Sequence, residues 1–305
     1  MKAGTLDGVL NVIKPAGMTS FDVVAYLRRL LNIKKIGHCG TLDPSAAGVL
    51  PVCAGAATGI TDYLSGQDKS YRAEILFGLA TDSIDLDGNI LRAERLPRPD
   101  KQKLEPVLAG LTGRQLQVPP MYSAVKSGGK RLYELARQGL EVSREPREIT
   151  VYGIRFVRAE YGRVILDIDC SKGTYIRSIC GDIGKRLGVD TCLSFLVRTS
   201  AAGLRIQDAR TLEELEQINE SGRIQEVLIP VEEMLNGYES CYLSSDLLRK
   251  FLNGVSIKAR EIGLGSQPAE YFVKVFDSGG IFYAIGKVVF EKNDSVLRMK
   301  KLFRI

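Results

Sequence analysis

Hydrophobic and polar side chains alternate along several stretches of this 305-residue chain, and the period of the alternation predicts the local structure. Residues 69–78 place Tyr71, Ala73 and Ile75 on one side, and residues 164–170 repeat the same period of two. This period is typical of a strand with one buried face. We therefore expect two half-buried strands.

Three other stretches carry apolar side chains at helical spacing. Residues 21–31 follow a Thr-Ser pair at 19–20, and either residue can cap a helix N-terminus. Residues 175–187 show the same spacing and stop before Gly188, a residue type that commonly ends helices. A third, acidic amphipathic helix is predicted over 211–220.

The end of the chain predicts a separate small β module. Three strand-like runs, 271–276, 281–290 and 296–303, are separated by short polar turns. Short strands joined by tight turns imply a small barrel or sandwich. Because 305 residues also exceed the usual size of one domain, two domains are expected.

Charge is distributed unevenly along the chain, whose formal net charge is +6. Residues 241–305 hold eleven Lys and Arg against six Asp and Glu, whereas residues 207–240 hold nine acids against two arginines. Two basic blocks therefore flank an acidic connector. This layout favours a polyanion lying across two domains, although a solvated lysine-rich surface explains it equally well.

Composition argues against several kinds of site. The six cysteines include no C-x-x-C pair, so we expect small buried residues rather than zinc or redox ligands. The single histidine, His38, excludes a multi-histidine metal site. The weakly polar run 46–60 is interrupted and too short for a bilayer, and no secretory signal is visible. We expect a cytoplasmic protein without a membrane segment.

The stretch 37–52 sets one carboxylate, Asp43, among glycines, alanines and prolines. Pro44 disfavours a helical backbone at Asp43, and the glycines allow the main chain to approach a ligand closely. An arbitrary Asp-Pro pair is usually a solvated turn. Here the surrounding residues favour a loop that carries an acid to a substrate.

The segment 83–94 has nearly the spacing of a calcium-binding EF-hand loop, with Ser83 in place of the first aspartate. A strand is predicted before it and Pro97 follows it, so the flanking helices of an EF-hand are missing. We do not expect calcium binding here.

Several segments, occurring in one order along the chain, resemble pseudouridine synthases of the TruB type. The Asp43 loop matches that family's signature almost residue for residue. The other matching segments are 14–20, 69–88, 119–139 and 170–178. Matches in the same order are far more specific than any single one of them.

The resemblance implies an α+β fold. The catalytic domain, residues 1–240, would be a mixed α/β unit built on an antiparallel-rich sheet around a central cleft. Residues 119–150 would form an inserted RNA clamp. Residues 241–305 would form a small β-barrel similar to a PUA domain that binds RNA.

The resemblance also implies a reaction, the isomerisation of uridine 55 in the T-arm of tRNA. The N1–C1′ bond breaks, the uracil turns, and C5 is joined to C1′. Asp43 would be the catalytic aspartate, and Arg177 would keep its carboxylate ionised. Asp43 would either attack covalently or take a ribose proton, and the sequence leaves both routes open. No cofactor and no metal are implied.

Further residues carry over as substrate contacts. Tyr71 would stack on the target uracil, Tyr175 and Leu196 would form the pocket wall, and His38 would help hold the flipped nucleotide. Lys14 would support the loops of the site, although it could equally be an ordinary lysine at the end of a strand.

The chain departs from the family pattern in the segment 190–199. Cys192 stands where a histidine is usual, and Val197 replaces an arginine. We expect these changes to affect details of RNA binding rather than the chemistry.

We expect a monomer. The alternatives are a non-catalytic RNA-binding or RNA-folding protein and a homologue that acts on ribosomal RNA within a guide complex.

Overall fold

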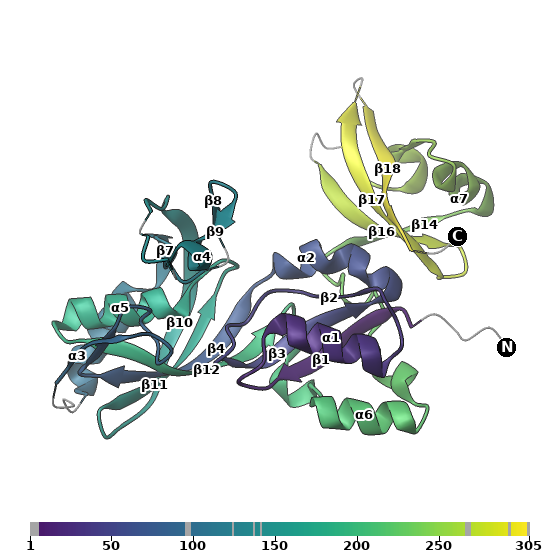
Figure 1. The fold of residues 1–305 in the computed structure, drawn as a ribbon. Helices are drawn as coiled ribbons and strands as arrows, with labels where there is room; N and C mark the ends of the chain where they lie inside the picture. The colour runs from purple at the N-terminus through teal and green to yellow at the C-terminus, as the bar shows by residue number, and fades with distance from the viewer. Residues whose placement is uncertain are drawn as a thin grey trace.

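The computed structural model describes residues 6–94, 99–123, 125–136, 138–140, 142–265, 270–291 and 294–303. Ala124 and Arg137, two residues of the segment 119–139, lie outside this set. Figure 1 shows one long twisted sheet with helices packed along it and a second, smaller sheet beside one end. The expected α+β fold is confirmed.

The large sheet has nine strands in the described part of the chain. Its order is β1-β3-β12-β4-β11-β10-β7, with β2 beside β3 and β13 beside β12. Within it only β12 and β3 run parallel. The strands are β1 Gly8–Lys14, β2 Ile36–His38, β3 Ala47–Ala54, β4 Lys69–Phe77, β7 Gly113–Gln117, β10 Arg147–Glu160, β11 Arg163–Cys170, β12 Thr191–Ala201 and β13 Leu204–Arg205.

Helices cover the two halves of this sheet separately. Helices α3 and α5 pack on the strands around β4 and β11, whereas α1 and α6 pack on β1 and β3 (Figure 1). The α-helices are α1 Ser20–Leu30, α2 Thr61–Ser65, α3 Lys101–Gly110, α4 Leu132–Ala136, α5 Ile176–Leu187, α6 Leu212–Glu220 and α7 Ser245–Leu252. Short 3₁₀ turns are η1 Gly55–Ile60, η2 Ile206–Asp208, η3 Ile224–Val227 and η4 Ala259–Ile262.

The second sheet has the order β14-β16-β17-β18-β15 and buries its own apolar core against α7. Its strands are β14 Glu239–Leu243, β15 Ile257–Lys258, β16 Tyr271–Asp277, β17 Phe282–Glu291 and β18 Asp294–Leu302. The aromatic rings of Tyr63, Tyr238 and Phe272 meet edge to face and join this sheet to the first. The sheet is curled and fits the PUA-like module expected for the C-terminus.

Two hairpins project from the large sheet. The first consists of β5 Leu79–Thr81 and β6 Ile90–Ala93, and the second of β8 Lys126–Ser127 and β9 Lys130–Arg131. The second hairpin and α4 lie within the predicted insertion 119–150 and stand away from the main sheet in Figure 1.

The predicted elements agree closely with the observed ones. Thr19 caps α1 in a reciprocal arrangement with Asp22, and Gly188 ends α5 with a left-handed φ of 69°. The three C-terminal strands lie where they were expected. The pattern did not reveal β10, because charged side chains interrupt its alternation, nor did it reveal α7.

All six cysteines are free and buried, which confirms that they are small core residues. Cys39 directly follows β2 and Cys53 lies on the neighbouring β3, with their Sγ atoms 3.3 Å apart. Across the ranges described, no helix has both the length and the apolar surface to cross a bilayer.

The centre of the large sheet depends on apolar burial, and Leu166→Ala tests this dependence. Leu166 on β11 is 0% exposed. Its truncation should lower the free energy of unfolding by about 2–5 kcal/mol, because the surrounding strands cannot close the cavity. Denaturant unfolding measures the change.

The matched control is Leu116→Ala on the edge strand β7, where the side chain is 71% exposed. This change should stay within about 0.5 kcal/mol of the parent. Equal losses at the two leucines would contradict the assignment of the core.

Candidate active site

The loop between β2 and β3 carries Asp43 to the surface beside β12, an interior strand of the sheet. Gly40 and Gly48 adopt φ values of 104° and 108°, a region that favours glycine, and they bend the chain at both ends of the loop. The main-chain N–H of Gly17 donates to Pro44 O at 2.8 Å. The Asp43 side chain remains 45% exposed, so solvent and ligands can reach it.

Arg177 holds Asp43 from the first turn of α5. Its Nη2 lies 2.9 Å from Asp43 Oδ2 and also donates to Tyr122 O at 2.7 Å. Its Nη1 lies 3.2 Å from Asp85 Oδ2. Arg177 is 5% exposed. One buried guanidinium therefore joins three segments that are far apart in sequence.

Asp85 is the second carboxylate on this guanidinium. It lies in the turn between β5 and β6, and its side chain is 12% exposed. Burial raises the pKa of Asp85, while hydrogen bonding from Ser83 and the charge of Arg177 act in the opposite direction. Its neighbour Ile84 has φ 62°, a strained conformation for a β-branched residue. This segment serves the ion pair rather than a calcium site.

Lys14 lies at the end of β1 directly behind the Asp43 loop. It is 0% exposed, and its Nζ donates to Pro15 O, Met18 O and Pro44 O at 2.8, 2.6 and 3.1 Å. Burial lowers the pKa of Lys14 from 10.5 to about 8, although the nearby charge of Asp43 opposes this shift. Lys14 thus ties the loop that follows β1 to the residue after Asp43.

Tyr71 lies on β4 with 8% of its surface exposed, and burial raises the pKa of its phenol. Its partner across the strands is Arg198 of β12. The positive charge of Arg198 opposes the effect of burial on the phenol pKa.

The remaining predicted residues lie around this centre. His38 ends β2 half-buried, and burial lowers the pKa of its imidazole. Its buried Nδ1 has no hydrogen-bond partner among the described residues. Tyr175 caps α5, and Gln117 holds its main-chain N–H and C=O at 2.8 and 3.1 Å.

A small hollow of about 30 Å³ lies beside Asp43 and Arg177. Of the predicted site residues it brings together Asp43, Arg177 and Leu196, whereas Lys14, His38, Tyr71 and Tyr175 do not line it. Leu86 and Phe195 also line it and are 55% and 47% exposed. Space of this size holds about one or two waters.

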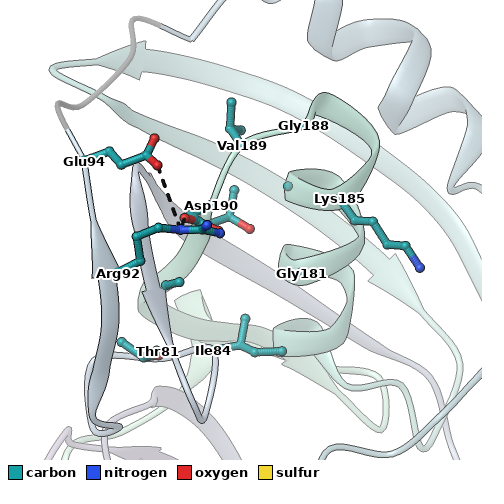
Figure 2. Close-up of a pocket in the computed structure, with 12 residues that line it drawn as sticks. Thr81, Ile84, Arg92, Glu94, Gly181, Lys185, Gly188, Val189 and Asp190 are labelled. Atoms are coloured by element: carbon teal, nitrogen blue, oxygen red, sulfur yellow. Dashed lines mark hydrogen bonds and ion pairs between the residues drawn. The ribbon is translucent and has the colours of Figure 1, made fainter.

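A larger hollow of about 420 Å³ lies elsewhere, between α5 and the hairpin β5–β6. Figure 2 shows Arg92 reaching Asp190 and Glu94 across it, while Lys185 points away. The Arg92–Asp190 pair is bidentate, at 2.5 and 2.8 Å. None of the predicted site residues lines this larger hollow, so the small hollow at Asp43 is the better candidate for chemistry. Within the ranges described, no group of three His, Cys, Asp or Glu could hold a metal ion.

Comparison with known families identifies the family of the chain. A family model described as TruB family pseudouridylate synthase, N-terminal domain, matches residues 28–176. A second model, the tRNA pseudouridylate synthase B C-terminal domain, matches residues 177–236. Together they span more than half of the chain. The chain belongs to the TruB family.

Individual relatives agree with this assignment. The tRNA pseudouridine synthase B of Moorella thermoacetica is 48% identical over 255 residues, covering 82% of this chain and 83% of that protein. The protein of the same name from Caldanaerobacter subterraneus is 43% identical and covers 98% and 100%. In a solved Cbf5-Nop10-Gar1 complex, a chain 26% identical superposes with a TM-score of 0.77, covering 98% of this chain and 85% of that one.

Two residues of this TruB-family site escaped the sequence interpretation. Asp85 lies inside a segment that resembles the family, but its partner could not be known before the fold was. Arg198 lies in the segment 190–199, where only the departures from the family pattern drew attention. For Arg198 the available signal was a charge among the residues of a strand, whereas Asp85, in a turn with other acids, offered no such signal.

The lowered pKa of Lys14 predicts a pH-dependent contribution to stability. Between about 8 and 10.5 the unfolded chain binds more protons at Lys14 than the folded chain does, so the free energy of unfolding rises with pH. Relative to Lys14→Met, the parent should gain about 2 kcal/mol between pH 8 and pH 10.

Denaturant titrations of both proteins at each pH measure this difference. Lys35→Met, at an exposed lysine of the same region, should show no such change relative to the parent. A parent–Lys14→Met difference that stays constant or shrinks as the pH rises would contradict the lowered pKa.

Proposed function

We propose that this chain isomerises uridine 55 in the T-arm of tRNA to pseudouridine, with Asp43 as the catalytic aspartate. The ion pair of Asp43 with buried Arg177 is the observation that carries the proposal. It places a carboxylate, held at a fixed position, at the mouth of a hollow. Relatives named tRNA pseudouridine synthase B, similar over most of the chain, support tRNA as the substrate.

The reaction needs one acid and no oxidant, reductant or added water. The N1–C1′ bond breaks, the uracil turns while it remains bound, and a C5–C1′ bond forms as C5 loses its proton. Asp43 either forms a bond to the nucleoside or removes a ribose proton while the base departs. Both routes need an ionised carboxylate in a place that excludes water.

Arg177 suits both needs. Its guanidinium is fixed on the far side by Asp85 and Tyr122 O, so it orients Asp43 without moving. A nearby positive charge favours an ionised acid in a desolvated site. The hollow holds about one or two waters, so a flipped base would have to displace them together with the exposed side chains of Leu86 and Phe195.

Several residues would hold the RNA. We propose that Tyr71 stacks on the uracil, that Tyr175 and Leu196 form the wall, and that His38 contacts the flipped nucleotide through its neutral imidazole. Lys14 would keep the Asp43 loop in place. Stacking on an aromatic ring contributes about 1–3 kcal/mol per base, which offsets part of the cost of flipping.

We propose that different segments of the chain carry catalysis and RNA binding. Residues 1–240 would carry catalysis, 119–150 would clamp the RNA, and 241–305, with net positive charge, would bind its backbone. We propose a cytoplasmic monomer that needs no cofactor. The likeness to a chain of the Cbf5-Nop10-Gar1 complex favours one second candidate, a synthase that acts within a larger assembly.

Asp43→Asn tests the acid. The rate of pseudouridine formation should fall by at least about 10²–10⁴-fold, because the amide can neither attack nor accept a proton. The Kd for tRNA should stay within about threefold, because the shape of the side chain is kept. Single-turnover assays and filter binding measure the two quantities. Full activity in Asp43→Asn would remove this residue from the mechanism.

The matched control is Asp208→Asn, at an acid of the acidic connector whose side chain is 64% exposed. It should leave both quantities unchanged. The same assay with unmodified tRNA and no other component distinguishes the candidates. Pseudouridine at position 55 supports a stand-alone synthase, a need for added RNA or protein favours the assembly, and binding without product favours an RNA-binding protein.

A further inference from the structure

Arg198 is the largest fully buried side chain in the described part of the chain, with 0% exposure. It lies on β12, directly across from Tyr71 on β4. A buried guanidinium is costly unless its N–H groups are bonded. The position of these bonds therefore shows what the side chain is for.

The guanidinium of Arg198 donates hydrogen bonds to the main chain on both sides of Asp43. Its Nη2 and Nη1 donate to Gly40 O and Thr41 O at 3.1 and 3.4 Å, just before Asp43. Its Nε donates to Val49 O at 2.7 Å, after Asp43. Each acceptor is a main-chain carbonyl, so the fork of Arg198 spans the loop without neutralising its acid.

The main chain of Arg198 fixes the same loop. Gly48 pairs with Arg198 in the short parallel contact between β3 and β12. A Cβ at Gly48 would lie 2.3 Å from Arg198 O, so only glycine permits this approach. The loop is thus held at its end by the backbone of Arg198 and along its length by the side chain.

The same side chain reaches Tyr71. Arg198 and Tyr71 lie directly opposite each other on the β4–β12 ladder, and the positive charge of Arg198 acts on the phenol. Tyr71 is the residue proposed to stack on the uracil, and Asp43 the one proposed to act on it. The guanidinium of Arg198 therefore lies beside both the Tyr71 ring and the loop that carries Asp43.

We propose that Arg198 is a positioning residue, whose guanidinium sets the distance between the Asp43 loop and the Tyr71 ring. This inference rests on the proposed function. Because Arg198 is buried, it acts through these two partners and does not touch RNA. Its loss should slow turnover while RNA binding persists.

Arg198→Lys is the decisive variant, since lysine keeps the charge but cannot donate to Gly40 O, Thr41 O and Val49 O in a fixed geometry. We expect kcat to fall by about 10–10²-fold, because small displacements of reacting groups cost this much. The KM for tRNA should stay within about threefold. The control is Arg223→Lys, at an exposed arginine of the acidic connector, which should leave both constants unchanged.

A double-mutant cycle with Tyr71→Phe separates positioning from a general loss of structure. Tyr71→Phe alone should lower kcat with little change in KM, and it should cost much less in the Arg198→Lys background, because the guanidinium beside the phenol is already lost. A purely structural role would give independent effects and similar changes in kcat and KM.

The outcomes are distinguishable. If the unmodified protein has no activity on tRNA, the proposed function is wrong. An active parent with kcat unchanged in folded Arg198→Lys, or with independent effects in the cycle, would overturn the role of Arg198 alone. If Arg198→Lys does not fold, Tyr71→Phe still decides, because a wild-type kcat in that variant would contradict the proposal.

Discussion

The site depends on one buried guanidinium that two carboxylates share. Arg177 meets Asp43 on its exposed side and Asp85 on its buried side, while Tyr122 O fixes the remaining direction. A charge buried to this extent is stable only when paired and fully hydrogen-bonded. The loop after β2, the hairpin β5–β6, the base of the insertion and α5 must therefore keep their relative positions.

Further buried cations stand around the same acid. Lys14 and Arg198 are both 0% exposed, and both donate to main-chain carbonyls of the segments that flank Asp43. Carbonyl oxygens satisfy the N–H groups but leave the positive charge in place. The buried positive charges therefore gather behind the Asp43 loop. Loops that carry function gain their precision from such fixed supports.

Several elements could be predicted because their signals are local. The cap at Thr19, the left-handed stop at Gly188 and the alternation along β4 and β11 each depend on neighbours within a few residues. The strand β10 could not be predicted in this way, because part of its length is solvated and loses the alternation. The resemblance to the TruB family singled out Asp43 and Arg177, but not the partners that hold Arg177 in place.

The sequence by itself determined the family and the α+β class, and it singled out Asp43 as the candidate catalytic residue, because these follow from residue types at fixed local spacing. Only the tertiary structure showed that Asp85 shares Arg177 and that Arg198 spans the Asp43 loop. These contacts join residues 92 and at least 149 positions apart along the chain. Local pattern carries no information on such distances, since the packing of the whole sheet sets which strand ends meet.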